Sequence, residues 1–225
     1  MQLAYKGNQQ VKCIRIATEA DRDAIGRLRQ AAFLASPDFH MPNDDWAKSH
    51  LPWSTDDDCA VVLGIWDGAE LLATMRAEFV ADRNAAESKF DGARIPESHI
   101  EWPAITLNRA ATREGYRQFG LNALMRMHFI AAAHHSGVRR LYGYVVLGAA
   151  RTKLMTDLGY EFEARPDQDP FHPPKKNSWA VAWLDLPQYG QHAVNSLANM
   201  LAEEIHQYEW QGPKLDDLRS ILANP

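Results

Sequence analysis

The spacing of apolar residues along the chain changes between a strand-like period of two and a helix-like period of three to four. In the first third, this spacing predicts a strand, a helix and then a β-hairpin, at residues 13–16, 19–34 and 59–79. Asp67-Gly68 lies within the third of these segments and is typical of a hairpin turn. Residues 35–58 contain three prolines and two tryptophans, which favour a long irregular loop of the kind that often covers a binding site.

The rest of the chain continues to mix strands with helices. We expect, in order, strand, helix, strand, helix, strand and strand at residues 101–111, 120–137, 141–147, 149–158, 160–164 and 178–186. The order predicts an α/β domain, with a mixed central sheet flanked by helices. That domain would span residues 13–186, after an irregular lead-in at 1–12 and before a C-terminal helical extension at 187–225.

Length and composition narrow the classes of protein. The chain has 225 residues, of which 46% are hydrophobic and 24% charged, as expected for a globular domain with a sizeable core. No apolar run approaches the roughly 18 residues that cross a bilayer, and the first fifteen residues hold three basic side chains without an apolar block. We therefore expect no membrane segment and no secretory signal. Two cysteines cannot build a disulfide framework, which favours a reducing cytoplasmic compartment.

Charge is distributed unevenly along the chain. The net charge is −5, but residues 109–156 hold eight basic side chains and one acidic one, a net +7, so that the rest of the chain carries −12. A positive segment in an acidic protein favours an anionic small ligand or an acidic protein partner. It argues against nucleic acid, which binds domains that are basic overall. No zinc, P-loop, dinucleotide or nucleophile-elbow motif is present in the sequence, so we expect no metal.

The segment from Glu101 to Leu121 is the most informative for chemistry. A predicted strand leads into a turn that contains Arg113 and Arg117, and a predicted helix begins after Gly120. The first N–H groups of a helix have no partner within it, and the helix dipole is positive there, which suits a pyrophosphate. Gly120 would let the ligand approach the backbone, and Arg117 would add charge.

This segment resembles the acyl-CoA signature of the GCN5-related N-acetyltransferase (GNAT) superfamily. Arg117-x-x-Gly120 is similar to its phosphate-binding motif, and Leu158-Gly159-Tyr160 is similar to the end of its next strand–helix unit. The resemblance covers about residues 13–185. It implies a GNAT-like sheet and an N-acyltransferase whose donor is acyl-CoA or an acyl carrier protein. The donor-binding residues that it implies are Arg113, Arg117, Gln118, Gly120, Leu121 and Asn122.

Within the superfamily, the chain looks most similar to N-acyl amino acid synthases and acyl-homoserine lactone synthases. Those enzymes have an Arg on the return strand of the hairpin, as at Arg76, and a Glu-x-x-Arg-like fourth strand, for which the segment around Arg109 is a loose match. The resemblance implies that Arg76 and Arg109 hold a carboxylate of the acceptor, since an Arg can bind a carboxylate through two hydrogen bonds. Ordinary ion pairs on the strand surface are the alternative.

A loop rich in Trp and Asp follows the first helix in those enzymes and lies at the acceptor site. Here the matching loop contains Trp46 and Trp53, which would cover the acyl chain or the acceptor. Hydrophobic packing beneath the loop is the alternative. The acceptor implied is a small amine, such as an amino acid, that attacks the thioester directly in a ternary complex. We expect no nucleic-acid or membrane partner and leave a homodimer open.

An amine must lose a proton before it can attack a thioester. Glu101 is the first candidate for the base, with a solvated carboxylate at a strand end as the alternative, and Tyr144 is the reserve acid. Two departures from the superfamily pattern stand out, because Met155 replaces the usual Tyr acid and Asn122 replaces a small residue. They leave open a non-catalytic acyl-CoA-binding or interaction domain. A signal synthase that uses S-adenosylmethionine is the other alternative.

Overall fold

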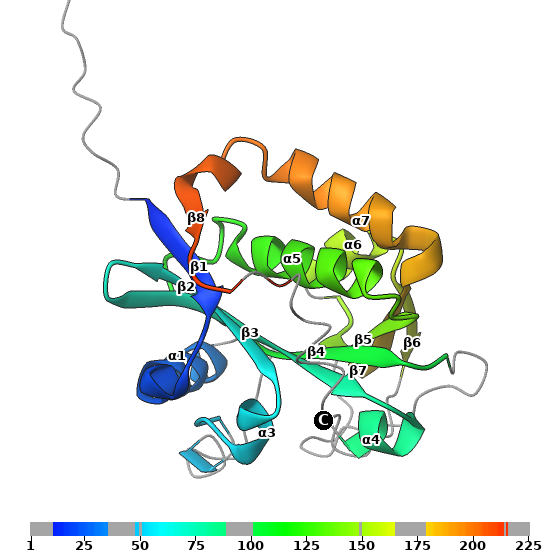
Figure 1. Cartoon of the computed structure of the whole chain (residues 1–225), viewed down its shortest axis with the longest axis horizontal. Coiled ribbons are helices and arrows are strands. Elements are labelled where there is room, and N and C mark those ends of the chain that lie inside the picture. Colours follow the sequence, from blue (N-terminus) through cyan, green and yellow to red (C-terminus); the bar gives the residue numbers. More distant parts are fainter. Residues whose placement is uncertain are drawn as a thin grey trace, which may run out of the picture.

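The computed structural model describes residues 11–35, 48–49, 51–88, 101–148, 150–164, 179–213 and 215. Within these ranges the strands form one mixed sheet in the order β6-β7-β5-β4-β3-β2-β1-β8 (Figure 1). The strands are β1 (Lys12–Ile16), β2 (Val61–Asp67), β3 (Glu70–Val80), β4 (Ala104–Thr112), β5 (Arg140–Val146), β6 (Glu161–Ala164), β7 (Trp179–Asp185) and β8 (Tyr208–Trp210). The predicted mixed α/β sheet is confirmed.

Helices cover both faces of this sheet (Figure 1). Helices α5, α6 and α7 lie over one face, while α1, α3 and α4 lie against the other. Their bounds are α1 (Arg22–Leu34), α3 (Thr55–Asp58), α4 (Arg83–Ser88), α5 (Leu121–His135), α6 (Ala150–Asp157) and α7 (Leu186–Met200). No described helix is at once long enough and apolar enough to span a membrane.

The main hydrophobic core lies between the central strands and α5. Met75, Ile105 and Leu141, from three neighbouring strands, belong to the same cluster as Phe129 of α5, and all four side chains are fully buried. The buried β5 explains why its sequence is apolar without alternation. Two smaller clusters, one beneath α1 and one beside α4, fill the opposite face. Both faces of the sheet are therefore covered by packed side chains, which hold the strands that carry the candidate site residues in place.

Strands β4 and β5 are the only parallel pair in the middle of the described sheet, and they pair over a short distance. Ala104–Leu107 pairs with Arg140–Gly143, and the pairing then stops. Beyond that point β4 stays with β3 as far as Thr112, and β5 stays with β7 as far as Val146. We call this point the divergence, because it divides the sheet into two halves joined by a four-residue seam.

The C-terminal extension is less helical than the sequence predicts. Helix α7 begins as expected, with Asp185 capping the Gln188 N–H and Pro187 in the first turn, a position that suits proline. Tyr208–Trp210 is not helical, however, because it forms β8 and pairs in parallel with β1 at the sheet edge. A three-residue strand has no periodicity of its own, so only the partner strand reveals it.

Candidate active site

The divergence coincides with a bulge in β4. Thr74 pairs with Ala111 and Arg76 pairs with Asn108, so Arg109 and Ala110 both lie opposite a single β3 residue. Arg109 has a φ of 51°, the only positive φ of a non-glycine residue in the described chain. A left-handed conformation costs a side-chain-bearing residue about 1–2 kcal/mol. Such strain persists only where the surroundings impose it, and it often marks a functional position.

The turn that follows β4, residues 113–120, is called the donor turn below. Two backbone hydrogen bonds close it, from Tyr116 N to Arg113 O at 3.0 Å and from Phe119 N to Tyr116 O at 3.2 Å. Gly120, with a φ of 65°, is the N-cap of α5 and accepts a hydrogen bond from Leu124 N. The first amides of α5, including those of Leu121 and Asn122, thus lie at a helix N-terminus beside the carboxyl end of β4, where an anion is favoured.

Gly120 has a structural reason to be glycine besides any ligand. A Cβ built at this position would lie 2.6 Å from Cδ2 of Leu201, which follows α7. The positive φ adds to that constraint. The expectation that Gly120 serves close approach of a phosphate stays a prediction, and the side on which a Cβ would point is already filled by the C-terminal segment.

The two arginines of the donor turn have different surroundings. Arg113 donates to the carbonyl of Leu71 at 3.2 Å and forms an ion pair with Glu70 at 3.0 Å. Arg117 is exposed and donates to the carbonyl of Ala32 at 3.3 Å, and no carboxylate of the described residues pairs with it. Arg117 is therefore the arginine of this turn whose charge is available to a ligand. Gln118 beside it is exposed as well.

Half of the basic side chains in the positive segment, residues 109–156, are paired with carboxylates in the fold. Carboxylates from outside that segment pair with four of its eight basic side chains. The pairs are Arg113 with Glu70, Arg139 with Glu101, Arg140 with Asp185, and Lys153 with Asp157. The net charge of the segment alone therefore gives only weak support for an anionic ligand, and the expectation of such a ligand depends on Arg117 and the N-terminus of α5.

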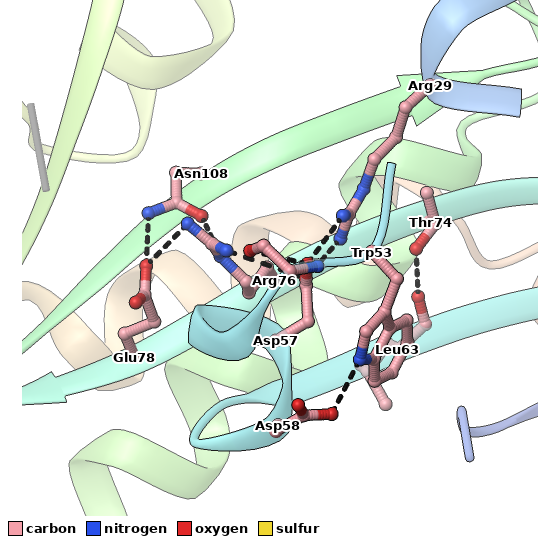
Figure 2. Close-up of polar contacts among 10 residues, drawn as sticks. Arg29, Trp53, Asp57, Asp58, Leu63, Thr74, Arg76, Glu78 and Asn108 are labelled. Carbon is pink, nitrogen blue, oxygen red and sulfur yellow. Dashed lines mark hydrogen bonds and ion pairs between the residues drawn. The ribbon is translucent and has the colours of Figure 1, made fainter. Parts of the chain in front are cut away.

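A network of buried charges lies on the face of the sheet opposite α5, on β3, β4, α1 and α3 (Figure 2). Asp57 of α3 binds Arg29 of α1 through two hydrogen bonds, of 2.7 and 3.0 Å, and lies 3.5 Å from Arg76 of β3. Arg76 also pairs with Glu78 at 3.0 Å and donates to Asn108 of β4 at 2.8 Å. Asn108 in turn donates to Glu78 at 2.6 Å. These five residues, the charged network, balance two positive charges with two negative ones.

Asp57 is the central residue of this network. Burial alone would raise the pKa of its carboxyl, but the hydrogen bonds and charge of Arg29, the Ser54 amide and the charge of Arg76 together lower that pKa. The Ser54 amide donates to Asp57 at 2.9 Å, so the same carboxylate caps α3. One ionised side chain thereby ties α1, α3 and β3 together.

Among the predicted acceptor residues, Arg76 lies in the charged network at the divergence. Its guanidinium already contacts Asp57, Glu78 and Asn108, so an acceptor carboxylate would have to share it. Arg109 lies on the β4 bulge. The sequence reading missed Arg29, although a charged residue four positions after Ile25, on the apolar face of the helix, is a signal that could have identified it.

The two predicted tryptophans fare differently. The Trp53 indole N–H donates to Asp58 at 2.7 Å (Figure 2). The Trp53 ring lies 5.8 Å from the Arg22 guanidinium. Trp53 also packs against the cluster beneath α1, which is the packing alternative named above. Trp46 lies outside the described residues.

The predicted catalytic residues lie at different ends of the seam. Glu101 precedes β4 and pairs with Arg139 at 3.2 Å and Arg140 at 3.4 Å, at the end of the strand opposite the donor turn. Tyr144, half-buried, is the first residue of β5 beyond its pairs with β4. Its neighbour on the same face, Tyr142, is fully buried, and burial raises the pKa of that phenol to about 12. The roles of Glu101 and Tyr144 stay predictions.

The two departures from the superfamily pattern can now be placed. Met155 is buried in the main core, with 1% of its surface exposed, so no acid is supplied from that position. Asn122 is half-buried in the first turn of α5. Among the described residues no group of three His, Cys, Asp or Glu side chains could hold a metal ion.

Comparison with known proteins rests on structure alone, because no family model and no curated sequence matches the chain. The acyl-homoserine lactone synthase BjaI, described as CoA-dependent, matches 93% of this chain and 98% of its own with a TM-score of 0.59 and 14% identity. FeeM, an N-acyl amino acid synthase from uncultured soil microbes, matches 79% and 94% with a TM-score of 0.52 and 13% identity. An N-acetyltransferase from Staphylococcus aureus Mu50 matches 78% and 98% with a TM-score of 0.54 and 14% identity.

At such identities the likeness establishes the fold. The chain has the fold of the GNAT acyltransferases, as the resemblance in the sequence implied.

Proposed function

We propose that the protein is an N-acyltransferase that moves an acyl group from acyl-CoA to the amine of a small acceptor. The observation that carries the proposal is the divergence of β4 from β5 beside the donor turn. An extended molecule with amide groups, such as the pantetheine arm of CoA, can hydrogen-bond to strands that no longer pair with each other. Its diphosphate would then meet the N-terminus of α5 and Arg117.

The proposed reaction uses this placement of the acyl donor. The acceptor amine attacks the thioester carbonyl in a ternary complex, a C–N bond forms, and the C–S bond breaks to release the CoA thiolate. Backbone N–H groups at the β4 bulge around Arg109 are our candidates to stabilise the developing oxyanion. Glu101 is our candidate to take the amine proton, and Tyr144 is our candidate to protonate the leaving thiolate. An acyl carrier protein is the alternative donor.

For the acceptor we propose an amino acid or a similar zwitterion. The charged network offers both guanidinium groups and carboxylates at one place, which complements an acceptor that has both charges. The names of two structural neighbours, an N-acyl amino acid synthase and an acyl-homoserine lactone synthase, agree with such an acceptor. The structure of the latter contains S-adenosylmethionine, so this compound belongs in any screen of acceptors.

The decisive experiment measures thiol release across acyl-CoA chain lengths with a panel of amino acids and S-adenosylmethionine. Turnover with an amino acid supports the proposal. CoA binding without turnover for any acceptor would favour a non-catalytic acyl-CoA-binding domain instead. Absence of S-adenosylmethionine binding would remove the signal-synthase alternative.

Charge reversal at Arg117 tests the donor assignment. Arg117→Glu is expected to weaken CoA binding about tenfold or more, because a charge-assisted hydrogen bond contributes ~1.5–3 kcal/mol. Arg139→Glu controls for the change in net charge, since Arg139 is an exposed arginine beyond the other end of α5. This control also breaks the pair with Glu101, so the two variants are compared by CoA binding and not by turnover. An unchanged dissociation constant for Arg117→Glu would refute the phosphate assignment.

Glu101→Gln tests the proposed base. Turnover should fall mainly at low pH, where assistance from a base matters most. Equal rates to the wild type across the pH range would dismiss Glu101. Glu78→Gln is the informative companion, because the Glu78 carboxylate accepts a hydrogen bond from Asn108 at the divergence.

A further inference from the structure

Helix α7 and the residue after it approach the rest of the domain at three glycines. At each glycine, a Cβ would lie within 2.8 Å of a side chain across the contact, a distance that real Cβ atoms do not tolerate. The contacts are Gly120 with Leu201, Gly159 with Tyr189, and Gly190 with His134. At Gly159 and Gly190 the contacts include the Cβ atoms of Tyr189 and His134, so a side chain there would displace α7. At Gly120 a side chain would meet the end of the Leu201 side chain, which would have to turn away.

Two of these glycines lie on opposite sides of the divergence. Gly120 ends the donor turn, which follows β4. Gly159 follows α6 and precedes β6, which pairs with β7 in the half of the sheet that contains β5. Leu201 and Tyr189 belong to one continuous segment, so that segment reaches from one half of the sheet to the other.

The segment packs closely against the rest of the domain along its length. Leu186, Ala193 and Leu197 are fully buried, and Leu201 is 4% exposed. The Leu186 carbonyl lies 3.0 Å from Nδ1 of His134, which fixes the start of α7 on the end of α5. Close-packed interiors transmit displacement rather than absorb it, so a change at one glycine contact moves the others.

We propose that the segment Leu186–Leu201 is a brace that sets the affinity for the acyl donor. Leu201 and Tyr189 are positioning residues: Leu201 holds the donor turn through Gly120, and Tyr189 holds the opposite half through Gly159. The brace fixes the separation of the two halves at the divergence and the direction of the first amides of α5. This inference rests on the proposed function, because it assumes that the donor lies between these halves.

Leu201→Ala tests the brace directly. It should weaken CoA binding at least about fivefold, the size of a modest coupling between sites, and raise KM for the donor more than it lowers kcat. Leu28→Ala is the matched control, since it removes the same atoms from a similarly buried position on α1, outside the segment Leu186–Leu201 and on the opposite face of the sheet. The control should lower Tm comparably and leave the dissociation constant for CoA unchanged.

A second pair of variants separates the packing contact from backbone strain. Gly120→Ala should weaken CoA binding for two reasons, the positive φ at this position and the contact with Leu201. The double variant Gly120→Ala, Leu201→Ala should lose less binding free energy for CoA than the sum of the two single variants, because the contact is already removed by either one. Leu201→Val replaces Leu201→Ala if the alanine variant does not fold.

Three results overturn the brace. They are wild-type affinity in every folded Leu201 variant, equal weakening by the Leu28 and Leu201 substitutions, and full additivity in the double variant. Calorimetry with CoA alone keeps the two proposals apart. A wild-type protein that does not bind CoA overturns the proposed function and the brace with it, whereas wild-type binding with unaffected variants overturns the brace alone.

Discussion

The two faces of the sheet are held together by different forces. On one face, the apolar side, α5 and α7 pack through apolar side chains and close approaches at glycine. On the other face, the ionic side, α1 and α3 are tied to β3 and β4 by a network whose ions are almost fully buried. Apolar packing has no preferred direction but resists added volume, whereas a buried ion network depends on each partner remaining charged.

This difference suits the two substrates that we propose. The diphosphate and pantetheine of CoA are the same for every acyl donor, so a fixed wall can bind them. An acceptor is distinguished by its charges, which only directional polar groups can recognise. The cost is that the acceptor side cannot be altered one residue at a time, because removing one charge strands its buried partner.

The largest effect should come from breaking the ionic side. Asp57→Asn leaves the Arg29 guanidinium, 1% exposed, without its counter-charge, and we expect a loss of about 3–5 kcal/mol in the free energy of unfolding. Urea denaturation measures that loss. Asp58→Asn is the control, because the neighbouring Asp58 is 44% exposed and its pair with Arg22 contributes at most about 1 kcal/mol. Equal losses for both variants would contradict the ionic picture of this side.

The next effect tests the apolar side through pH. Burial lowers the pKa of His128 on α5 to about 4, and its ring packs 5.1 Å from that of Trp210 in β8. Because the folded pKa lies below the unfolded value of about 6.5, the stabilisation is complete above pH ~6.5 and is lost as the pH falls toward 4. The full loss is about 3 kcal/mol, reached only below the folded pKa.

His128→Phe keeps an aromatic ring beside Trp210 and removes the titration. We expect the variant to retain its stability between pH 6.5 and 4, where the wild type declines. His135→Phe, at an exposed histidine of the same helix, should decline as the wild type does. The lowered pKa of Asp57 places its own acid loss below this range. Parallel curves for the wild type and His128→Phe would disprove the assignment.

The sequence predicts the elements that depend on local neighbours, but it does not predict the contacts of the ionic side. The hairpin, the helix start at Gly120 and the buried β5 depend on neighbours within a few residues, so periodicity and turn residues reveal them. The contact between Arg29 and Asp57 spans 28 residues and that between Arg76 and Asn108 spans 32, and no local pattern encodes either. Of the charged network, the sequence therefore identifies only Arg76 as a candidate site residue. It predicts that Arg76 binds a carboxylate of the acceptor, whereas in the structure Arg76 binds carboxylates of the protein itself.

The donor turn shows the opposite failure. Its motif was evident in the sequence, but the reason for Gly120 was incomplete, because Leu201 lies 81 residues later. The bulge at Arg109 also had no local signal, since no glycine marks it. Strain of this kind is imposed by the pairing of β4 with β3 and becomes visible only when both strands are in place.

A smaller change in stability should come from the contact between Gly159 and Tyr189 on the apolar side. Gly159→Ala should cost about 1–3 kcal/mol more than Gly137→Ala, because both positions have positive φ but only Gly159 faces the Tyr189 ring, with 2.8 Å to its Cγ. No atom lies within 4 Å of a Cβ at Gly137, so that variant measures backbone strain alone. Thermal and urea unfolding of the two variants give the difference. Equal costs would mean that α7 can move away from Gly159 freely.

The smallest effect concerns the charge of the donor turn. Glu70→Gln removes the partner of Arg113 in an exposed ion pair, so stability should change by at most about 1 kcal/mol. CoA affinity should rise, by about twofold to threefold at low salt, because the released guanidinium adds to the field of Arg117 and the rise fades as salt screens it. Glu114→Gln, which removes an acid from the same turn that forms no ion pair among the described residues, controls for net charge. If both variants bind CoA equally tightly, Arg113 contributes to donor binding only through the net charge of the turn. A larger gain in CoA affinity for Glu70→Gln would instead show that the apolar side also depends on the charge of Arg113, which Glu70 partly neutralises.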